Sequence, residues 1–256
     1  RPPRSTLFPY TTLFRSGIMK IIQVIPTYNE AENLPILVNA LLSQEIEGLY
    51  ILIVDDNSPD GTGRVADQLA SEHPRQVSVL HRQGKEGLGK AYIQGFRQAL
   101  DQGAEVIGMM DADLSHPPDR LPALLAALSG ADVVIGSRYT PGGSVDKTWP
   151  MFRKFLSWFG NTYARTILGL PIKDTTGGYR LWRREALEAI HFEETRSSGY
   201  VFIVELAYMA KLAGLKFAEV PIYFAERSHG ESKMSLRIQI EAALRVWQLR
   251  RLYRDR

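Results

Sequence analysis

The chain has 256 residues, of which 45% are hydrophobic and 23% are charged, so it can bury a sizeable core and has the composition of a globular domain. It contains no cysteine, which excludes disulfides, thiolate nucleophiles and cysteine-ligated zinc. The net charge of +3 is mild and does not indicate a nucleic-acid-binding protein. No apolar run approaches the roughly 18 residues of a membrane-spanning helix, so we expect any membrane contact to be peripheral.

The first 18 residues differ from the rest of the chain. They are basic, rich in serine and threonine and free of acidic residues, and they show no clear amphipathic period. We expect residues 1–18 to be a non-native leader ahead of a native start at Met19, and the fold prediction omits them.

Short apolar or β-branched runs alternate with segments of helical spacing in the first half of the chain. The runs occupy residues 20–25, 50–54, 77–80, 106–110 and 132–136. This alternation predicts βαβ units, and hence an α/β fold with a Rossmann-like, mostly parallel central sheet flanked by helices. Most of the runs are followed by polar clusters, at 26–30, 55–58, 111–113 and 137–139. Because ligands bind at the carboxyl ends of parallel strands, these clusters predict one shared site.

The regular alternation stops at a Gly/Pro-rich loop over residues 140–144. Beyond it, the spacing of apolar residues predicts helices over 151–170 and 199–215, a strand over 216–224 and a basic amphipathic helix over 236–252. We expect a globular domain over residues 19–240 and a basic C-terminal helix over 241–256.

The triplet Asp111-Ala112-Asp113 stands at the end of the apolar run 106–110. Side chains alternate along a strand, so a strand that reaches the triplet would hold both carboxylates on one face. Such a pair suits Mg²⁺ or Mn²⁺ and leaves coordination positions for water and substrate phosphates. Strand-end aspartates more often cap a helix or bind nothing, so the triplet alone leaves both interpretations open.

Two further polar clusters have a structural interpretation beside a functional one. Asn29, followed three residues later by Glu32, predicts a capping box for a helix that begins at Glu30. The sequence Ser-Pro-Asp-Gly-Thr at 58–62 is typical of a turn. The preceding Asp55-Asp56 either forms the polar shoulder of that turn or accepts hydrogen bonds from a ribose or a base.

The segment from Gly84 to Ala91 fits the phosphate-binding pattern G-x-x-x-x-G-K. Ala91 stands where a Ser or Thr hydroxyl should reach Mg²⁺, which argues against a P-loop nucleotidase. Lys85 or Lys90 could still serve a phosphate, and a surface loop without a ligand is the alternative.

Several basic or titratable groups in the rest of the chain admit two interpretations. Residues 174–180 indicate a tight turn that ends in a cation, and Arg227 with residues 230–233 forms a basic loop typical of segments that close over phosphates. Solvated charge explains each equally well. We expect His116 to be a loop or capping histidine rather than a metal ligand. No G-x-S-x-G or H-E-x-x-H motif supports a triad hydrolase or a zincin.

Taken in order, a series of segments resembles the dolichyl- or polyprenyl-phosphate mannose synthases, which are family 2 inverting glycosyltransferases with the GT-A fold. The segments are PTYNE (26–30), VDDNSPDGT (54–62), KEGLGKA (85–91), DADLSHPP (111–118), GSRY (136–139), DTTGGYR (174–180), GYVFIVEL (199–206) and EVPIYFAERSHGESKMS (219–235). PTYNE and the DAD triplet are shared across the wider superfamily, whereas DADLSHPP with FAER and GESKMS indicates the polyprenyl-phosphate branch.

The resemblance implies a set of site residues. The nucleoside pocket would be lined by Pro26, Tyr28, Glu30, Val54 and Asp56. The diphosphate and its Mg²⁺ or Mn²⁺ would be met by Asp111, Ala112 and Asp113, with the two aspartates as metal ligands. Ser115 occupies the place of a glutamine that helps the metal in the family's best-matching motif, and a water could replace that ligand. The cations that hold the diphosphate and sugar would be Arg138, Arg227 and Lys233, and the catalytic set would be Asp113, Arg227 and Lys233.

The reaction implied by the resemblance is transfer of mannose from GDP-mannose to a dolichyl or polyprenyl phosphate with inversion. A phosphate monoester has a second pKa of about 6, so this acceptor can attack near pH 7 without a strong general base. Two alternatives stay open: a polyprenyl-phosphate glucosyltransferase that uses UDP-glucose, and a non-catalytic subunit that binds a nucleotide sugar or a lipid phosphate.

The resemblance is to the short form of the family, without transmembrane helices. We expect a cytoplasmic protein, peripheral on the cytoplasmic face of a membrane, and a partner subunit could supply anchoring.

Two helices could reach the bilayer that holds the acceptor. One carries the aromatic residues Phe152, Phe155, Phe159 and Tyr163 beside Arg153, Lys154 and Arg165. The other, at the C-terminus, carries Arg237, Arg245, Arg250, Arg251 and Arg254. Both fit interfacial helices on anionic lipid. An aromatic row at helical spacing is more often core, so membrane docking is favoured for the C-terminal helix.

Overall fold

The computed structural model describes residues 18–226 and 236–254, and for residues 236–242 the backbone alone. The strands, in chain order, are β1 (Ile21–Thr27), β2 (Leu49–Asp55), β3 (Val77–His81), β4 (Val106–Met109), β5 (Val133–Ser137), β6 (Ser144–Val145), β7 (Arg180–Arg183), β8 (Phe217–Pro221) and β9 (Tyr223–Phe224). The α-helices are α1 (Asn33–Leu42), α2 (Thr62–Glu72), α3 (Leu88–Asp101), α4 (Leu121–Ala127), α5 (Met151–Leu168), α6 (Arg184–Ala189), α7 (Gly199–Leu212) and α8 (Leu236–Leu252).

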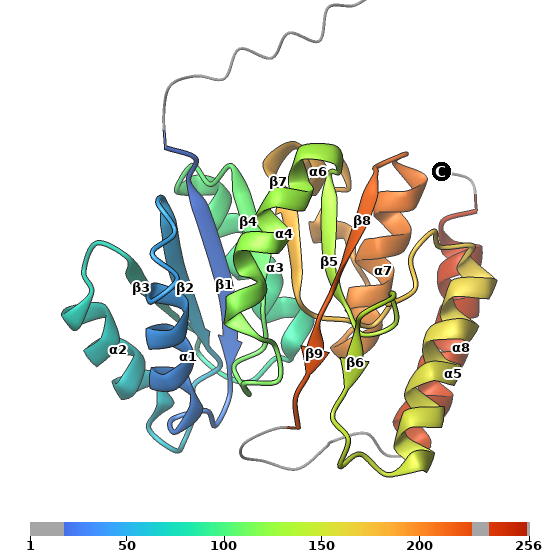
Figure 1. The fold of residues 1–256 in the computed structure, drawn as a ribbon, viewed down its shortest axis with the longest axis horizontal. Coiled ribbons are helices and arrows are strands. Elements are labelled where there is room, and N and C mark those ends of the chain that lie inside the picture. Colours follow the sequence, from blue (N-terminus) through green and yellow to red (C-terminus); the bar gives the residue numbers. More distant parts are fainter. Residues whose placement is uncertain (1–17, 227–235, 255–256) are drawn as a thin grey trace, which may run out of the picture.

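A seven-stranded sheet in the order β3-β2-β1-β4-β7-β5-β8 forms the centre of the molecule (Figure 1). Strand β1 runs parallel to β2 and β4, β2 parallel to β3, and β5 parallel to β8. The short strands β6 and β9 form a separate parallel pair. The predicted α/β fold with a mostly parallel sheet flanked by helices is confirmed.

Strand β7 is antiparallel to both of its neighbours, β4 and β5, and the sequence did not predict it. Its four residues give too short a pattern to predict a strand, and its first residue, Arg180, was assigned to the end of the turn over 174–180. Leu181 packs into the hydrophobic cluster on one face of the sheet and Trp182 into the cluster on the other. The strand is therefore fixed by burial on both faces.

The two hydrophobic clusters cover opposite faces of the sheet. Alternate residues of β1 divide between them: Ile22 and Val24 pack with residues of α3 and α7, whereas Ile21 and Ile25 pack with residues of α1, α2 and α4. This alternation is the expected behaviour of a strand buried on both faces.

The predicted capping box at Asn29 is wrong. Helix α1 begins at Asn33, and Asn29 has a φ of 62°, in the left-handed region. The turn at 58–62 explains the difference, because its side chains accept the N–H groups of residues 29–31. The acceptors are Ser58 Oγ (3.2 Å), Thr62 Oγ1 (2.9 Å) and Asp60 Oδ2 (3.2 Å). The polar segments 26–30 and 58–62, which the sequence analysis treated separately, are therefore joined by hydrogen bonds.

The predicted strand over 216–224 is interrupted at Ile222, which separates β8 in the large sheet from β9 in the small one. The domain boundary expected at residue 240 falls within α8, a single helix from Leu236 to Leu252. Its residues Val246 and Leu249, and Tyr253 directly after the helix, are buried in the cluster that contains α7. The C-terminal helix therefore belongs to the domain core.

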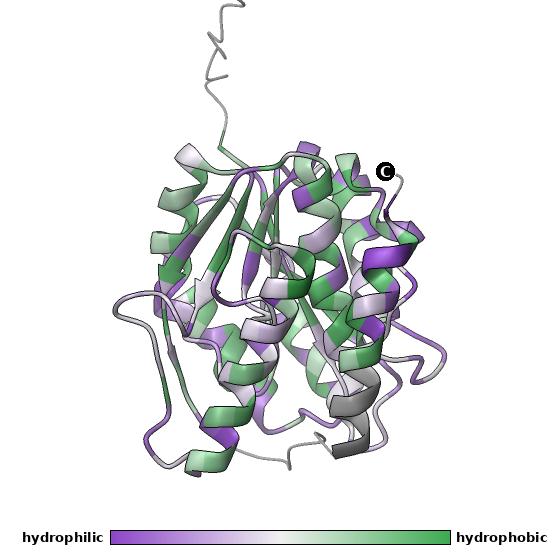
Figure 2. Ribbon diagram, turned by 90° about the vertical axis from the view of Figure 1, so that its right-hand side faces the viewer, coloured by the Kyte–Doolittle hydropathy of each residue, from purple (hydrophilic) through white to green (hydrophobic). Residues whose placement is uncertain are grey.

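Helix α5 lies beside α8 at the edge of the domain (Figure 1). Several of its aromatic side chains are exposed. The exposed fractions are 72% for Phe152, 56% for Phe155, 52% for Trp158 and 49% for Phe159. Figure 2 is turned so that α5 and α8 face the viewer. The core interpretation of this aromatic row is therefore wrong for Phe152, Phe155 and Phe159, whereas Tyr163 is partly buried and packs against the core. Among residues 18–226 and 236–254, no helix combines the length and apolar character needed to cross a bilayer.

Candidate active site

Parallel strands bring the predicted polar clusters to one edge of the sheet, at the lower side of Figure 1. Strands β1, β2 and β4 are parallel and adjacent in register, so residues 26–30, 55–58 and 111–113 follow strand ends that lie side by side. Pro26 is paired with Val54 across β1 and β2, and the N–H of Asp56 donates to the carbonyl of Thr27 at 3.0 Å.

The Asp111-Ala112-Asp113 triplet lies beyond the end of β4, which stops at Met109. Strand alternation therefore does not orient its carboxylates, contrary to the expectation from the sequence. Hydrogen bonds hold the segment instead. The N–H of Asp111 donates to His116 Nδ1 at 3.1 Å, and Asp113 Oδ1 accepts from the N–H and the Oγ of Ser115 at 3.1 and 2.5 Å.

His116 is buried beside the triplet, and its side chain accepts a hydrogen bond from the backbone N–H of Asp111. Its burial lowers its pKa, although the charges of Asp111 and Asp113 oppose that shift. The ring is therefore neutral near pH 7, with Nδ1 as the acceptor for Asp111. The expectation that His116 is a loop histidine is consistent with this contact. The sequence did not predict that its ring accepts a hydrogen bond from the triplet.

The two carboxylates of the triplet share a buried environment that suits a divalent metal. Burial, together with the charges of Asp111 and Asp113, raises the pKa of the Tyr92 hydroxyl well above its usual range. A hydrogen bond with Asp111 contributes to the same shift. No group of three or more His, Cys, Asp or Glu side chains with metal-site geometry occurs among the described residues. Two carboxylates are the usual protein share for Mg²⁺ beside substrate phosphates, so Asp111 and Asp113 could hold it.

Ser115 points into the protein rather than toward a ligand. Its side chain is fully buried, and its hydroxyl donates to Asp113 at 2.5 Å. The structure thus gives Ser115 the task of orienting Asp113.

On the nucleoside side of the edge, Lys85 Nζ lies 3.6 Å from the centre of the Tyr28 ring. This cation–π contact draws the loop before α3 onto the residue that follows β1. Glu30 Oε2 accepts a hydrogen bond from Asn33 Nδ2 at 2.8 Å, at the start of α1. Tyr28, Glu30 and Lys85 therefore lie along one border of the predicted pocket.

Asp56 is paired with Arg82, a buried residue that the sequence reading missed. Arg82 directly follows β3 and donates to Asp56, to Glu86 at 2.5 Å and to Gln94 at 3.1 Å. Burial raises the pKa of Asp56 despite the opposing effect of Arg82. The signal was present in the sequence, because Arg82 follows a strand end just as the other polar clusters do.

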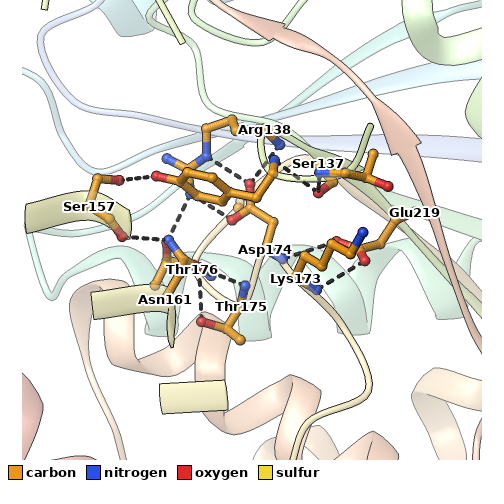
Figure 3. Close-up of polar contacts among 12 residues, drawn as sticks. Ser137, Arg138, Ser157, Asn161, Lys173, Asp174, Thr175, Thr176 and Glu219 are labelled. Carbon is orange, nitrogen blue, oxygen red and sulfur yellow. Dashed lines mark hydrogen bonds and ion pairs between the residues drawn. The ribbon is translucent and has the colours of Figure 1, made fainter. Parts of the chain in front are cut away.

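The fourth cluster, at the end of β5, is built around a buried ion pair (Figure 3). Arg138 Nε and Nη2 donate to the two carboxylate oxygens of Asp174 at 2.7 and 2.6 Å, and the N–H of Arg138 donates at 2.9 Å. Burial alone would lower the pKa of Arg138 and raise that of Asp174, but the attraction between them raises the first and lowers the second. Within the described chain, Nη1 of Arg138 has no acceptor, so it is available to an anion.

Two further side chains hold the loop that carries Asp174. Glu219 on β8 accepts the N–H groups of Lys173 and Asp174 at 2.9 and 3.0 Å. Asn161 on α5 accepts those of Thr175 and Thr176 at 2.8 and 3.2 Å. The ion pair is therefore fixed from two neighbouring elements.

Arg180, which the sequence suggested as a site cation, is instead a structural residue. It is fully buried and donates to the backbone carbonyls of Gly177, Ile203 and Thr175 at 2.8 to 2.9 Å. Burial lowers its pKa to about 10, so it stays protonated near pH 7. Arg227 and Lys233 lie outside the described residues, and their assignment stays a prediction.

We expect Asp174→Asn to lower the free energy of unfolding by about 3 to 5 kcal/mol, because it leaves the buried charge of Arg138 without its partner. Glu188→Gln is the control, since it removes an exposed ion pair with Arg184 that is worth about 0.5 kcal/mol. Urea denaturation of both variants measures the difference, and equal losses would contradict the assignment.

The pair also has a defined pH dependence. The pKa of Asp174 is lower in the folded protein, so its stabilising contribution is complete above the unfolded-state pKa of about 3.9. The contribution is lost as pH falls from there through the folded pKa. Asp174→Asn should therefore lose stability less steeply than the wild type on acidification.

Comparison with known proteins agrees with this arrangement. Residues 23–190 match the family model described as glycosyl transferase family 2. Undecaprenyl-phosphate mannosyltransferase of Micrococcus luteus is 49% identical over 89% of this chain and 93% of its own. Polyprenol monophosphomannose synthase of Mycolicibacterium smegmatis is 48% identical over 90% of this chain and 88% of its own.

A solved structure with the same fold is the mannosyltransferase PcManGT from Pyrobaculum calidifontis, in complex with GDP-Man and Mn²⁺. It superposes with a TM-score of 0.64 at 17% identity, over 94% of this chain and 66% of that one. At this identity the likeness concerns the fold. The family match and the two close relatives together show that the chain belongs to the family 2 glycosyltransferases.

Proposed function

We propose that this protein transfers mannose from GDP-mannose to a polyprenyl phosphate, giving polyprenyl-phosphate mannose and GDP with inversion at the anomeric carbon. The observation that carries the proposal is that the Asp111–Asp113 segment lies near the Arg138–Asp174 pair: the charge of Asp111 acts on Arg138, and all four charges act on His116. Both relatives at about 48% identity are named for mannose transfer to a polyprenyl phosphate.

The acceptor supplies its own nucleophile. A phosphate monoester has a second pKa of about 6, so one of its oxygens is anionic near pH 7 and can attack the anomeric carbon. As that C–O bond forms, the bond from the anomeric carbon to the diphosphate breaks, and GDP leaves with the electron pair. The protein therefore needs to position two phosphate-bearing substrates and to neutralise the leaving group.

Charge neutralisation falls to a metal and to basic side chains. Asp111 and Asp113 would hold Mg²⁺ or Mn²⁺, which would supply positive charge to the diphosphate. Nη1 of Arg138 would donate to phosphate oxygens, while Asp174 holds the other edge of the guanidinium. We assign Arg227 and Lys233 to the same diphosphate from the segment after β9.

The nucleoside would bind at the ends of β1 and β2, where Pro26, Val54 and Asp56 lie together and Tyr28 lies under Lys85. Asp56 has a carboxylate, and a guanine base offers N–H donors to it. A uracil base also offers an N–H donor, so the glucosyltransferase alternative is separated by assay.

The lipid acceptor requires contact with a bilayer, and we propose that α5 provides it. Phe152, Phe155 and Phe159 are exposed on one helix, and Phe155 stacks on Phe159 with ring centres 6.1 Å apart. Exposed Lys147 and Arg165 flank the row and complement anionic lipid. In α8, Val246 and Leu249 are buried in the core, whereas Leu244, Trp247 and Leu252 are exposed, so α8, which lies beside α5, adds apolar surface to this contact. We further propose that this contact is on the cytoplasmic face of the membrane and that a partner subunit could supply anchoring.

We expect Asp113→Asn to reduce mannose transfer by about a hundredfold or more, because it removes one of two charged metal ligands. The amide oxygen can still accept the hydrogen bonds of Ser115, so the fold should persist. Asp119→Asn, an exposed aspartate six residues on, is the control and should keep full activity. The measurement is transfer of labelled mannose from GDP-mannose to a short polyprenyl phosphate, with Mg²⁺, Mn²⁺ or EDTA.

The same assay with UDP-glucose tests the alternatives. Metal-dependent transfer from GDP-mannose alone supports the proposal, and transfer from UDP-glucose alone would replace mannose by glucose. Binding of GDP-mannose without transfer under any condition would favour a non-catalytic subunit. A folded and fully active Asp113→Asn would refute the metal assignment.

Phe155→Ser should weaken binding to vesicles that contain anionic phospholipid by about tenfold, because part of a phenyl ring no longer leaves water on docking. Ile36→Ser on α1 is the matched control, since Ile36 is 55% exposed and Phe155 is 56% exposed. Vesicle flotation measures both. Equal binding by the two variants would remove α5 from the contact.

A further inference from the structure

Asn161 lies on the inner face of α5, on the helix whose outer face carries the exposed aromatic row. Its side chain is 2% exposed. Asparagine is a poor residue for a helix interior, and a buried amide needs partners for both of its donors and for its oxygen. The hydrogen-bond partners of Asn161 therefore identify the segment that α5 holds in place.

The amide of Asn161 bonds mainly to the loop that follows Asp174 (Figure 3). Its Oδ1 accepts the N–H of Thr175 at 2.8 Å, the Oγ1 of Thr175 at 3.0 Å and the N–H of Thr176 at 3.2 Å. Its Nδ2 donates to the carbonyl of Ser157 at 2.9 Å and to Thr176 Oγ1 at 3.1 Å, and Thr176 Oγ1 is also within donating distance of Oδ1 at 3.3 Å.

Thr176 Oγ1 is the atom at which α5 and Arg138 meet. It accepts from Nη2 of Arg138 at 2.9 Å and from Nδ2 of Asn161 at 3.1 Å. A hydroxyl oxygen has two acceptor positions, and these two donors fill them. By contrast, Thr175 Oγ1 contacts Asn161 but not Arg138.

A second hydrogen bond connects the segment after β5 to α5. The hydroxyl of Tyr139 donates to Ser157 Oγ at 2.7 Å. Consecutive residues at the end of β5, Arg138 and Tyr139, are thus attached to α5 through Asn161 and Ser157. Phe155, Trp158 and Phe159 point from this helix to solvent.

We propose that Asn161 is a positioning residue that, through Thr176 Oγ1, fixes the guanidinium of Arg138 relative to the lipid-facing helix. The phosphate-binding edge and the membrane-contacting surface are then held as one unit, so that a docked enzyme presents Arg138 at a set position. This inference rests on the proposed function, in which Arg138 serves phosphate oxygens and α5 contacts lipid.

Three substitutions separate positioning from loop stability. Thr176→Val removes the hydroxyl that links Asn161 to Arg138 and keeps the branched shape. Thr176→Ser restores the hydroxyl. Thr175→Val removes a hydroxyl that bonds to the same Asn161 oxygen without contacting Arg138. We expect Thr176→Val to lower kcat/KM for mannose transfer by about tenfold, with a higher KM for GDP-mannose, since a bond to a charged group is lost.

Thr176→Ser should return kcat/KM to within about twofold of the wild type, and Thr175→Val should stay in that range. Wild-type kinetics for Thr176→Val, or equal losses in both valine variants, would overturn the inference. If Thr176→Val fails to fold, Thr176→Ala serves in its place, because it removes the same hydroxyl and puts no methyl group where the hydroxyl was.

The assay also distinguishes this inference from the proposed function. Absence of mannose transfer by the wild type would refute the function. Calorimetric binding of GDP with Mg²⁺ by the same variants would then test the positioning of Arg138 alone. Weaker binding by Thr176→Val than by Thr176→Ser and Thr175→Val supports it, and equal binding refutes it.

Discussion

The buried ion pair of Arg138 and Asp174 is the constraint around which the second half of the site is arranged. The arginine side chain is 8% exposed and that of the aspartate is fully buried, so neither charge can rely on water. The pair must be bidentate and further hydrogen-bonded, which brings the loop before β7 to the end of β5. Glu219 and Asn161 then hold that loop from β8 and α5. Strand β7 follows directly and fills the space between β4 and β5.

The part of the site at the ends of β1, β2 and β4 is held by hydrogen bonds rather than by a buried ion pair. The parallel strands β1, β2 and β4 end side by side, and the segments beyond them are held by hydrogen bonds to backbone N–H groups rather than by strand geometry. His116 accepts from Asp111, Ser115 donates to Asp113, and the turn at 58–62 accepts from residues 29–31. Because these bonds fix the backbone, the carboxylates can remain directed at a ligand.

Local pattern and the family resemblance were enough to predict much of this protein. The runs at 20–25, 50–54 and 77–80 became β1, β2 and β3, and α8 spans the predicted 236–252. The parallel arrangement followed from the alternation of strands and helices. The predicted nucleoside residues Pro26 and Val54 are neighbours in the sheet.

What the sequence missed depends on contacts between distant segments. The partner of Arg138 is 36 residues away and that of Asp56 is 26 residues away, so no local pattern announces either pair. Arg180 looked like a site cation because its burial is set by β7, a strand too short to predict. The aromatic row of α5 had the spacing of a core helix, and only the assembled domain shows that it is exposed.

The most direct test of this account is a crystal structure with GDP and Mn²⁺, in which anomalous scattering locates the metal. We expect the anomalous peak at the carboxylates of Asp111 and Asp113, with the diphosphate beside it and the guanine at the ends of β1 and β2. A manganese peak away from both aspartates, with GDP bound at another part of the surface, would contradict the central claim.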